Sequence, residues 1–176
     1  MRIDTVETKV YRFSELSDEA KEKAVERFAD VDVTDEWWDS TFEDAAQIGL
    51  KITEFDGGQC GYCRGEWTED AESVAGIIKE NHGETCETFK NAENFLTELA
   101  EKQKAFEAAD DYDPEYEEFE ESDEYDEICA EFKRVIREDY LTILRREYEY
   151  RTSEAAIVET IEANEYEFTE AGEIYS

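Results

Sequence analysis

The chain has little positive charge and few of the residues on which catalysis depends. It holds 18 Lys and Arg against 51 Asp and Glu, which is a net charge of -33, with one Pro and one His in 176 residues. So acidic a surface repels nucleic acids and anionic membranes and speeds encounters with basic proteins. No apolar run approaches the length of a transmembrane helix. We therefore expect no direct nucleic-acid binding and no membrane insertion.

Motifs of known catalytic chemistry are also missing. The sequence has no P-loop, no G-x-S-x-G, no H-E-x-x-H and no G-x-G-x-x-G after a predicted strand. Carboxylates are so numerous that two of them lying close in sequence indicates nothing about acid–base catalysis. We expect a non-enzymatic protein without a cofactor.

Three of the four cysteines, together with the one histidine, are candidate metal ligands. Met1 and Arg2 lead into a polar segment without a signal peptide, so the expected location is the cytoplasm, where thiols are reduced or metal-bound. The spacing Cys60-x-x-Cys63 with His82-x-x-x-Cys86 could supply four zinc ligands. A single CxxC is more often a pair of isolated thiols, and this one does not precede a helix as a redox motif does.

The apolar residues predict one α+β domain over residues 1–176, because 40% of the chain is hydrophobic and 13% aromatic. A small antiparallel sheet, formed by the N-terminal strand and two hairpins, is expected to pack with several helices. The predicted strands are 6–13, 50–56, 62–67 and a closing hairpin over 166–175; the predicted helices follow Ser17, Thr34 and Thr68, and cover 91–108, 114–151 and 153–163.

The most unusual stretch is the acidic run, Glu107–Glu127, in which 13 of 21 residues are carboxylates. No Lys or Arg occurs between Lys104 and Lys133. Aromatic and apolar residues recur through the run and beyond it mostly every three or four positions, which is the period of one helical face. The segment 109–127 is therefore predicted to be a linker followed by the acidic start of a long helix.

Asp113 and Pro114 supply a cap and a first-turn proline for that helix, which would end near Arg151. Repulsion between acidic neighbours opposes the helix, so its formation depends on packing of its aromatic residues. Nine carboxylates between Glu115 and Glu127 would then give about one charge per 2.2 Å of helix axis, close to the ~1.7 Å of duplex DNA. The expected partner-binding residues are Asp113, Glu115, Glu117, Glu118, Glu120, Glu121, Asp123, Glu124 and Glu127.

Trp37 is a second candidate contact, because tryptophan is favoured at binding hot spots. Adjacent helical residues point about 100° apart, so we expect Trp38 in the core and Trp37 nearer the surface. An alternative to electrostatic binding is thus an aromatic face of Trp37, Tyr112 and Tyr116, with acidity serving solubility. Adaptation to high salt would also make a chain acidic, but would spread the acid evenly.

Three segments, VYRFSELSDEAKEKAVERF, WWDSTFEDAAQIGLKITEFD and TSEAAIVETIEANEYEFTEAG, are similar to a family of small acidic bacteriophage proteins without an assigned activity. This resemblance implies a phage origin, action inside a bacterial host cell, and no site residues. In charge and size the chain also resembles phage DNA mimics, the antirestriction and anti-CRISPR proteins. The expected partner is a basic nucleic-acid-binding protein such as a host nuclease or CRISPR effector. The long helix could also pair with a second copy in a homodimer.

Overall fold

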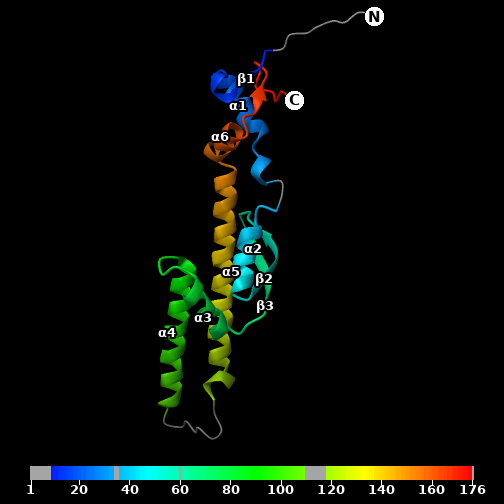
Figure 1. Cartoon of the computed structure of the whole chain (residues 1–176). Coiled ribbons are helices and arrows are strands. Elements are labelled where there is room, and N and C mark those ends of the chain that lie inside the picture. The colour runs from blue at the N-terminus through cyan, green and yellow to red at the C-terminus, as the bar shows by residue number, and fades with distance from the viewer. Residues whose placement is uncertain (1–8, 34–35, 60, 110–117, 176) are drawn as a thin grey trace, which may run out of the picture. The chain divides into compact units, whose positions relative to one another are not determined.

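The computed structural model describes residues 9–33, 36–59, 61–109 and 118–175 (Figure 1). The chain divides into two compact units, which we call unit 1 (Met1–Trp37 with Arg146–Ser176) and unit 2 (Trp38–Arg145). Among the described residues there are six α-helices and two antiparallel sheets of two strands each, which confirms the α+β class. A single domain stays a prediction, because compactness does not establish whether the units unfold together.

Unit 1 is built around a small aromatic core. Its elements are β1 (Tyr11–Arg12), the 3-10 turns η1 (Phe13–Glu15) and η2 (Val31–Val33), α1 (Asp18–Arg27), α6 (Glu154–Ala163) and β4 (Glu167–Phe168). Strand β1 pairs with β4, with Tyr11 opposite Phe168. The buried residues are Phe13, Leu16, Ala20, Ala24, Phe28, Ile157, Ile161 and Phe168.

The predicted first strand is too long. Only Tyr11 and Arg12 are in a strand among the described residues of 6–13, and residues 6–8 lie outside the description. The chain turns at Phe13 because the Glu15 carboxylate accepts the Arg12 backbone N–H at 2.7 Å. The predicted helix starts at Ser17 and Ser153 are confirmed, since each serine caps its helix with a hydroxyl that accepts an N–H three residues later.

The predicted closing hairpin is present as a tight turn. Gly172 has a φ of 81°, and the Thr169 N–H donates to the Glu173 carbonyl at 2.8 Å. Phe168 and Ile174 form a single antiparallel bridge. The turn closes on α1, where the Gly172 backbone lies against the Ala20 carbonyl.

Unit 2 combines a hairpin with helices. Its elements are α2 (Asp39–Gln47), β2 (Leu50–Asp56), β3 (Tyr62–Trp67), α3 (Ala71–Asn81), α4 (Glu87–Glu107), the 3-10 turn η3 (Phe119–Glu121), and α5 (Asp123–Arg151) up to Arg145. The hairpin has the predicted limits, and Gly49 before it has the left-handed φ of 86° expected at a helix end. Arg145 holds the hairpin loop by donating to the carbonyls of Gly57 and Gly58 at 3.1 and 2.6 Å.

Several predicted helix starts in unit 2 are wrong. Helix α2 begins at Asp39 rather than directly after Thr34, which lies outside the described residues. Helix α3 is capped by Asp70 instead of Thr68, and α4 begins at Glu87, four residues early, where the Cys86 sulfur accepts the Phe89 N–H at 3.4 Å. Cysteine is not among the usual capping residues, so sequence preferences did not identify this start.

Replacing Asp70 by Ala is expected to lower the free energy of unfolding by about 1 kcal/mol. Asp70 accepts the Ser73 backbone N–H at 2.8 Å and the Ser73 hydroxyl at 2.9 Å. These bonds, the backbone one first, lower the pKa of Asp70. Its contribution is therefore present above the unfolded pKa of about 3.9 and is lost as the pH falls through the lower folded pKa.

Urea unfolding of wild type and Asp70→Ala at several pH values measures this effect. The stability difference should shrink on acidification, while Asp70→Asn keeps the cap without its titration. Equal stability of wild type and Asp70→Ala at neutral pH would contradict the capping role.

The core of unit 2 is organised by aromatic pairs between α4 and the segment from η3 into α5. Phe95 and Phe132 stack with ring centroids 4.2 Å apart and an interplanar angle of 14°. Phe106 and Phe119 approach to 5.6 Å. Helices α4 and α5 lie side by side in this unit and run in opposite directions (Figure 1). No described helix is long and apolar enough to span a bilayer.

Candidate functional site

The acidic run is not one continuous helix. Asp113, Glu115 and Glu117 lie outside the described residues. Over 118–122 the prediction of a helix from Pro114 is wrong: Glu118 and Ser122 have extended backbones around the short turn η3, and α5 begins at Asp123. Glu118, Glu120 and Glu121 therefore precede the helix, while Asp123, Glu124 and Glu127 lie in its first two turns. The uniform helical charge spacing does not hold across this stretch.

Ser122 explains where α5 begins. Its hydroxyl donates to the Phe119 carbonyl at 2.6 Å and accepts the Tyr125 N–H at 3.2 Å. A serine side chain that bonds to nearby backbone in this way favours a helix start over a helix interior. Starting the helix here also removes part of the acid–acid repulsion that a longer helix would carry.

Phe119 anchors the acidic run to the core. Its side chain is only 4% exposed and lies 5.6 Å from the Phe106 ring and 5.8 Å from the Tyr125 ring. Glu118, Glu120 and Glu121 on either side of it are exposed. One buried ring thus anchors the stretch of backbone from which three exposed carboxylates project.

Most carboxylates of the described run have no cationic neighbour. Lys102 pairs with Glu124 at 2.7 Å, and this hydrogen bond raises the pKa of Lys102. Between residues 118 and 127, the described residues contain no other ion pair to a Lys, Arg or His. The carboxylates left without such a partner are those of Glu118, Glu120, Glu121, Asp123, Asp126 and Glu127.

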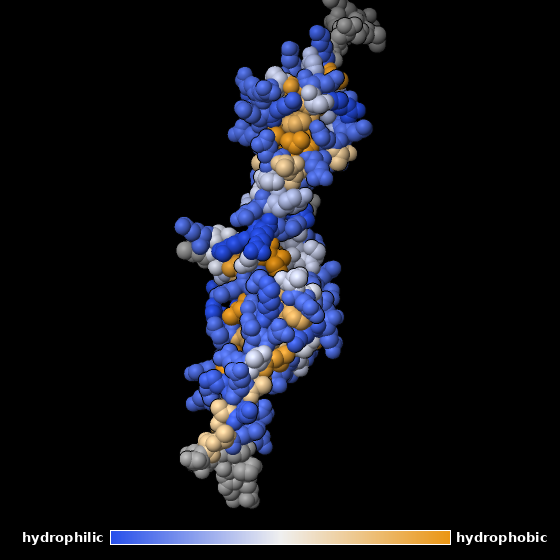
Figure 2. Space-filling model, turned by 90° about the vertical axis from the view of Figure 1, so that its left-hand side faces the viewer, coloured by the Kyte–Doolittle hydropathy of each residue, from blue (hydrophilic) through white to orange (hydrophobic). Residues whose placement is uncertain are grey.

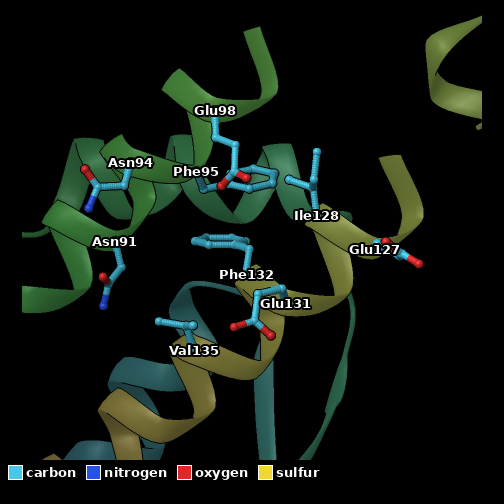
Figure 3. Close-up of a pocket in the computed structure, with 9 residues that line it drawn as sticks. All are labelled: Asn91, Asn94, Phe95, Glu98, Glu127, Ile128, Glu131, Phe132 and Val135. Carbon is cyan, nitrogen blue, oxygen red and sulfur yellow. The ribbon is translucent and has the colours of Figure 1, made fainter. Parts of the chain in front are cut away.

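A groove lies beside this surface, between α4 and α5 (Figure 3). Its volume is about 290 Å³, and its lining consists of Asn91, Asn94, Phe95 and Glu98 from α4 with Glu127, Ile128, Glu131, Phe132 and Val135 from α5. The stacked Phe95 and Phe132 rings occupy its centre, with carboxylates above and below them (Figure 3). The groove therefore combines apolar surface with negative charge.

Polar contacts hold the groove's side chains in place. Asn91 donates its amide to the Asp139 carboxylate at 2.7 Å, and burial raises the pKa of Asp139 despite that bond. Arg134 donates to both oxygens of Glu131, at 2.5 and 2.7 Å, and thereby lowers the pKa of Glu131.

Sequence reasoning missed the contribution of α4 to this site. Only Glu127 of the groove was among the predicted contacts. Asn91, Asn94 and Glu98 follow one another at steps of three and four, on the edge of the helical face that contains Phe95. That spacing was the available sign that these polar residues share one edge of α4, but it does not show which helix lies opposite that edge.

Trp37 is half-buried and its ring centroid lies 5.8 Å from that of Tyr148, while Tyr112 and Tyr116 lie outside the described residues. Trp38 is also half-buried, 5.7 Å from Phe55. The predicted contrast between a core Trp38 and a surface Trp37 is therefore wrong. Trp38 packs at the edge of the core because it precedes α2 instead of lying inside it.

The cysteines do not assemble a metal site in the described part of the chain. There, no three His, Cys, Asp or Glu side chains are placed to hold a metal ion, and Cys60 lies outside the description. Cys86 caps α4, His82 lies 3.8 Å from Asp44, and burial raises the pKa of Cys63 to about 11. Helix capping, the contact with Asp44 and burial thus describe Cys86, His82 and Cys63 separately, and the three side chains do not converge on one point.

Comparison of the chain with protein-family models, with curated proteins and with solved structures finds no match.

Proposed function

We propose that the protein is a phage-encoded, non-enzymatic inhibitor that occupies the basic nucleic-acid-binding channel of a host defence nuclease, of the CRISPR or restriction type. The observation that carries the proposal is the set of carboxylates at residues 118–127 that have no cationic partner among the described residues. Each of them is available to a Lys or Arg of another protein.

The negative charge of the protein favours a basic protein over any other class of binding partner. A net charge of -33 accelerates encounter with a positively charged channel and suppresses binding to nucleic acid itself. Most of the surface in Figure 2 is hydrophilic, with small hydrophobic patches between. Such a channel normally neutralises phosphates, and carboxylates on the backbone that the buried Phe119 anchors can take the place of those phosphates.

The test is binding of the purified protein to immobilised RNA-guided and restriction nucleases, with duplex DNA as competitor at constant salt. The acidic-run variant is Glu118→Gln, Glu120→Gln, Glu121→Gln and Glu127→Gln. Its matched control removes four exposed carboxylates of unit 1 instead, by Glu22→Gln, Glu26→Gln, Glu159→Gln and Glu162→Gln. Both variants have the same net charge, so any difference depends on position.

We expect DNA to compete with the wild-type protein, and the acidic-run variant to bind about tenfold or more weakly than the control. Binding of both should weaken as salt rises, because exposed charge pairs are screened. Equal loss in the two variants would contradict a localised DNA mimic. Salt-insensitive binding would instead point to an aromatic interface, since apolar burial is not screened.

A further inference from the structure

The groove between α4 and α5 has a lining that suits a cation with an apolar stem. Ile128 and Val135 are half-buried along α5, and the Phe95 and Phe132 rings, each 4% exposed, lie at its centre. A volume of about 290 Å³ is at the lower limit of small-molecule sites, which run from ~300 to ~1,000 Å³. The space therefore fits one side chain better than a larger ligand.

Carboxylates from both helices stand over the rings. Glu98 of α4 lies on one side and Glu131 of α5 on the other, while Glu127 stands at one end with its carboxylate turned outward (Figure 3). No ion pair joins Glu98 or Glu127 to a described Lys, Arg or His. The pKa of Lys102 is raised by its hydrogen bond to Glu124 and, to a smaller extent, by the negative charge of Glu98. Arg134 bonds to each oxygen of Glu131 and so fixes it, but a carboxylate has about four acceptor sites, and others remain.

We propose that this groove binds an arginine side chain of the partner protein, with its methylene stem on Ile128 and its guanidinium between Glu98 and Glu131. A planar guanidinium has five donors and can bond to carboxylates on two sides. A neutral apolar side chain would remove the Glu98 carboxylate from water without giving it a hydrogen-bond or ionic partner, and that desolvation costs free energy. The partner's identity rests on the proposed function, because basic nucleic-acid channels present arginines, but the groove can be tested without that partner.

The probe is the blocked tripeptide Ac-Gly-Arg-Gly-NH₂, titrated into the isotopically labelled full chain at low salt and followed by NMR. Control peptides carry citrulline, which has the shape of arginine without its charge, or lysine. The groove variant is Glu98→Gln, which leaves the Glu131–Arg134 pair intact. The matched control, Glu120→Gln, removes one exposed carboxylate of the acidic run that does not line the groove.

We expect the arginine peptide to shift the signals of Asn94 and Ile128, the lysine peptide to bind more weakly, and the citrulline peptide not to bind. The groove variant should lose about tenfold in affinity and the control variant less than about twofold. Shifts spread evenly along the acidic run, or equal loss in both variants, would overturn the proposal, because they would indicate a diffuse counterion cloud. Absence of arginine-peptide binding, or equal binding of citrulline, would overturn it as well.

Failure of this inference is distinguishable from failure of the proposed function. A protein that competes with DNA for a nuclease but ignores the arginine peptide retains the proposed function without the arginine groove. If the arginine peptide binds in the groove but no immobilised nuclease retains the protein, the arginine groove is supported and the proposed nuclease target is excluded.

Discussion

Phe132→Ala is expected to lower the free energy of unfolding of unit 2 by about 3–5 kcal/mol. Phe132 is 4% exposed and stacks on Phe95 at 4.2 Å, so its removal leaves a cavity at the α4–α5 contact. The lost stacking contributes about 0.5–1.5 kcal/mol of that cost. Because the same ring pair forms the centre of the groove, the variant should also lose arginine-peptide binding.

Urea unfolding followed by circular dichroism measures the stability change. Phe132→Leu is the matched control, because it keeps an apolar side chain of similar reach and should cost much less than alanine. A loss below about 1 kcal/mol for Phe132→Ala would show that the two helices are not held together by this stack.

Gly172→Ala is expected to destabilise unit 1 by more than about 2 kcal/mol. Gly172 has a φ of 81°, where a Cβ is strained, and an added Cβ would lie 2.2 Å from the Ala20 carbonyl oxygen. The three nearest atoms all belong to the Ala20 backbone, so there is no flexible side chain that could move away. The closing turn would have to separate from α1.

Gly76→Ala is the matched control for this substitution. Gly76 lies inside α3, and an added Cβ would meet nothing within 4 Å. Alanine should therefore stabilise the helix by about 0.5–1 kcal/mol, the opposite sign. A similar small effect of both substitutions would contradict the close contact of Gly172 with α1.

The substitutions Phe132→Ala and Gly172→Ala together also test the predicted single domain. Phe132 belongs to unit 2 and Gly172 to unit 1. One cooperative domain would show a single unfolding transition that both variants shift. Two independent domains would show separate transitions, each sensitive to one of the variants.

Local patterns were sufficient for much of the fold. The hairpin of β2 and β3, the caps Ser17 and Ser153, and the left-handed Gly49 follow from alternation and capping chemistry that act within a few residues. The inward face of α3 follows from helical period alone, because its buried residues, Ala71, Val74, Ala75 and Ile78, recur at the spacing of one helical face. The α+β class depends only on such local signals.

Other features depended on competition between neighbouring signals. The sequence predicts that the long helix starts at Asp113-Pro114, but α5 begins after Ser122, close to the Phe119 ring that is buried against Phe106. Whether Phe119 can reach the core depends on the position of α4, which no local pattern encodes. The sequence therefore located the acidic run correctly but not the backbone that presents it.

By itself, the sequence determined the excess of negative charge, the lack of cations between Lys104 and Lys133, and the apolar faces of the helices. Only the tertiary structure decided which carboxylates stay unpaired and which face each other across a groove. Glu98 and Glu131 are 33 positions apart in the chain, and they flank the same ring pair because Phe95 and Phe132 stack. Contacts between distant residues depend on how the helices pack, and that packing minimises the exposed apolar area of the whole unit rather than of any one segment.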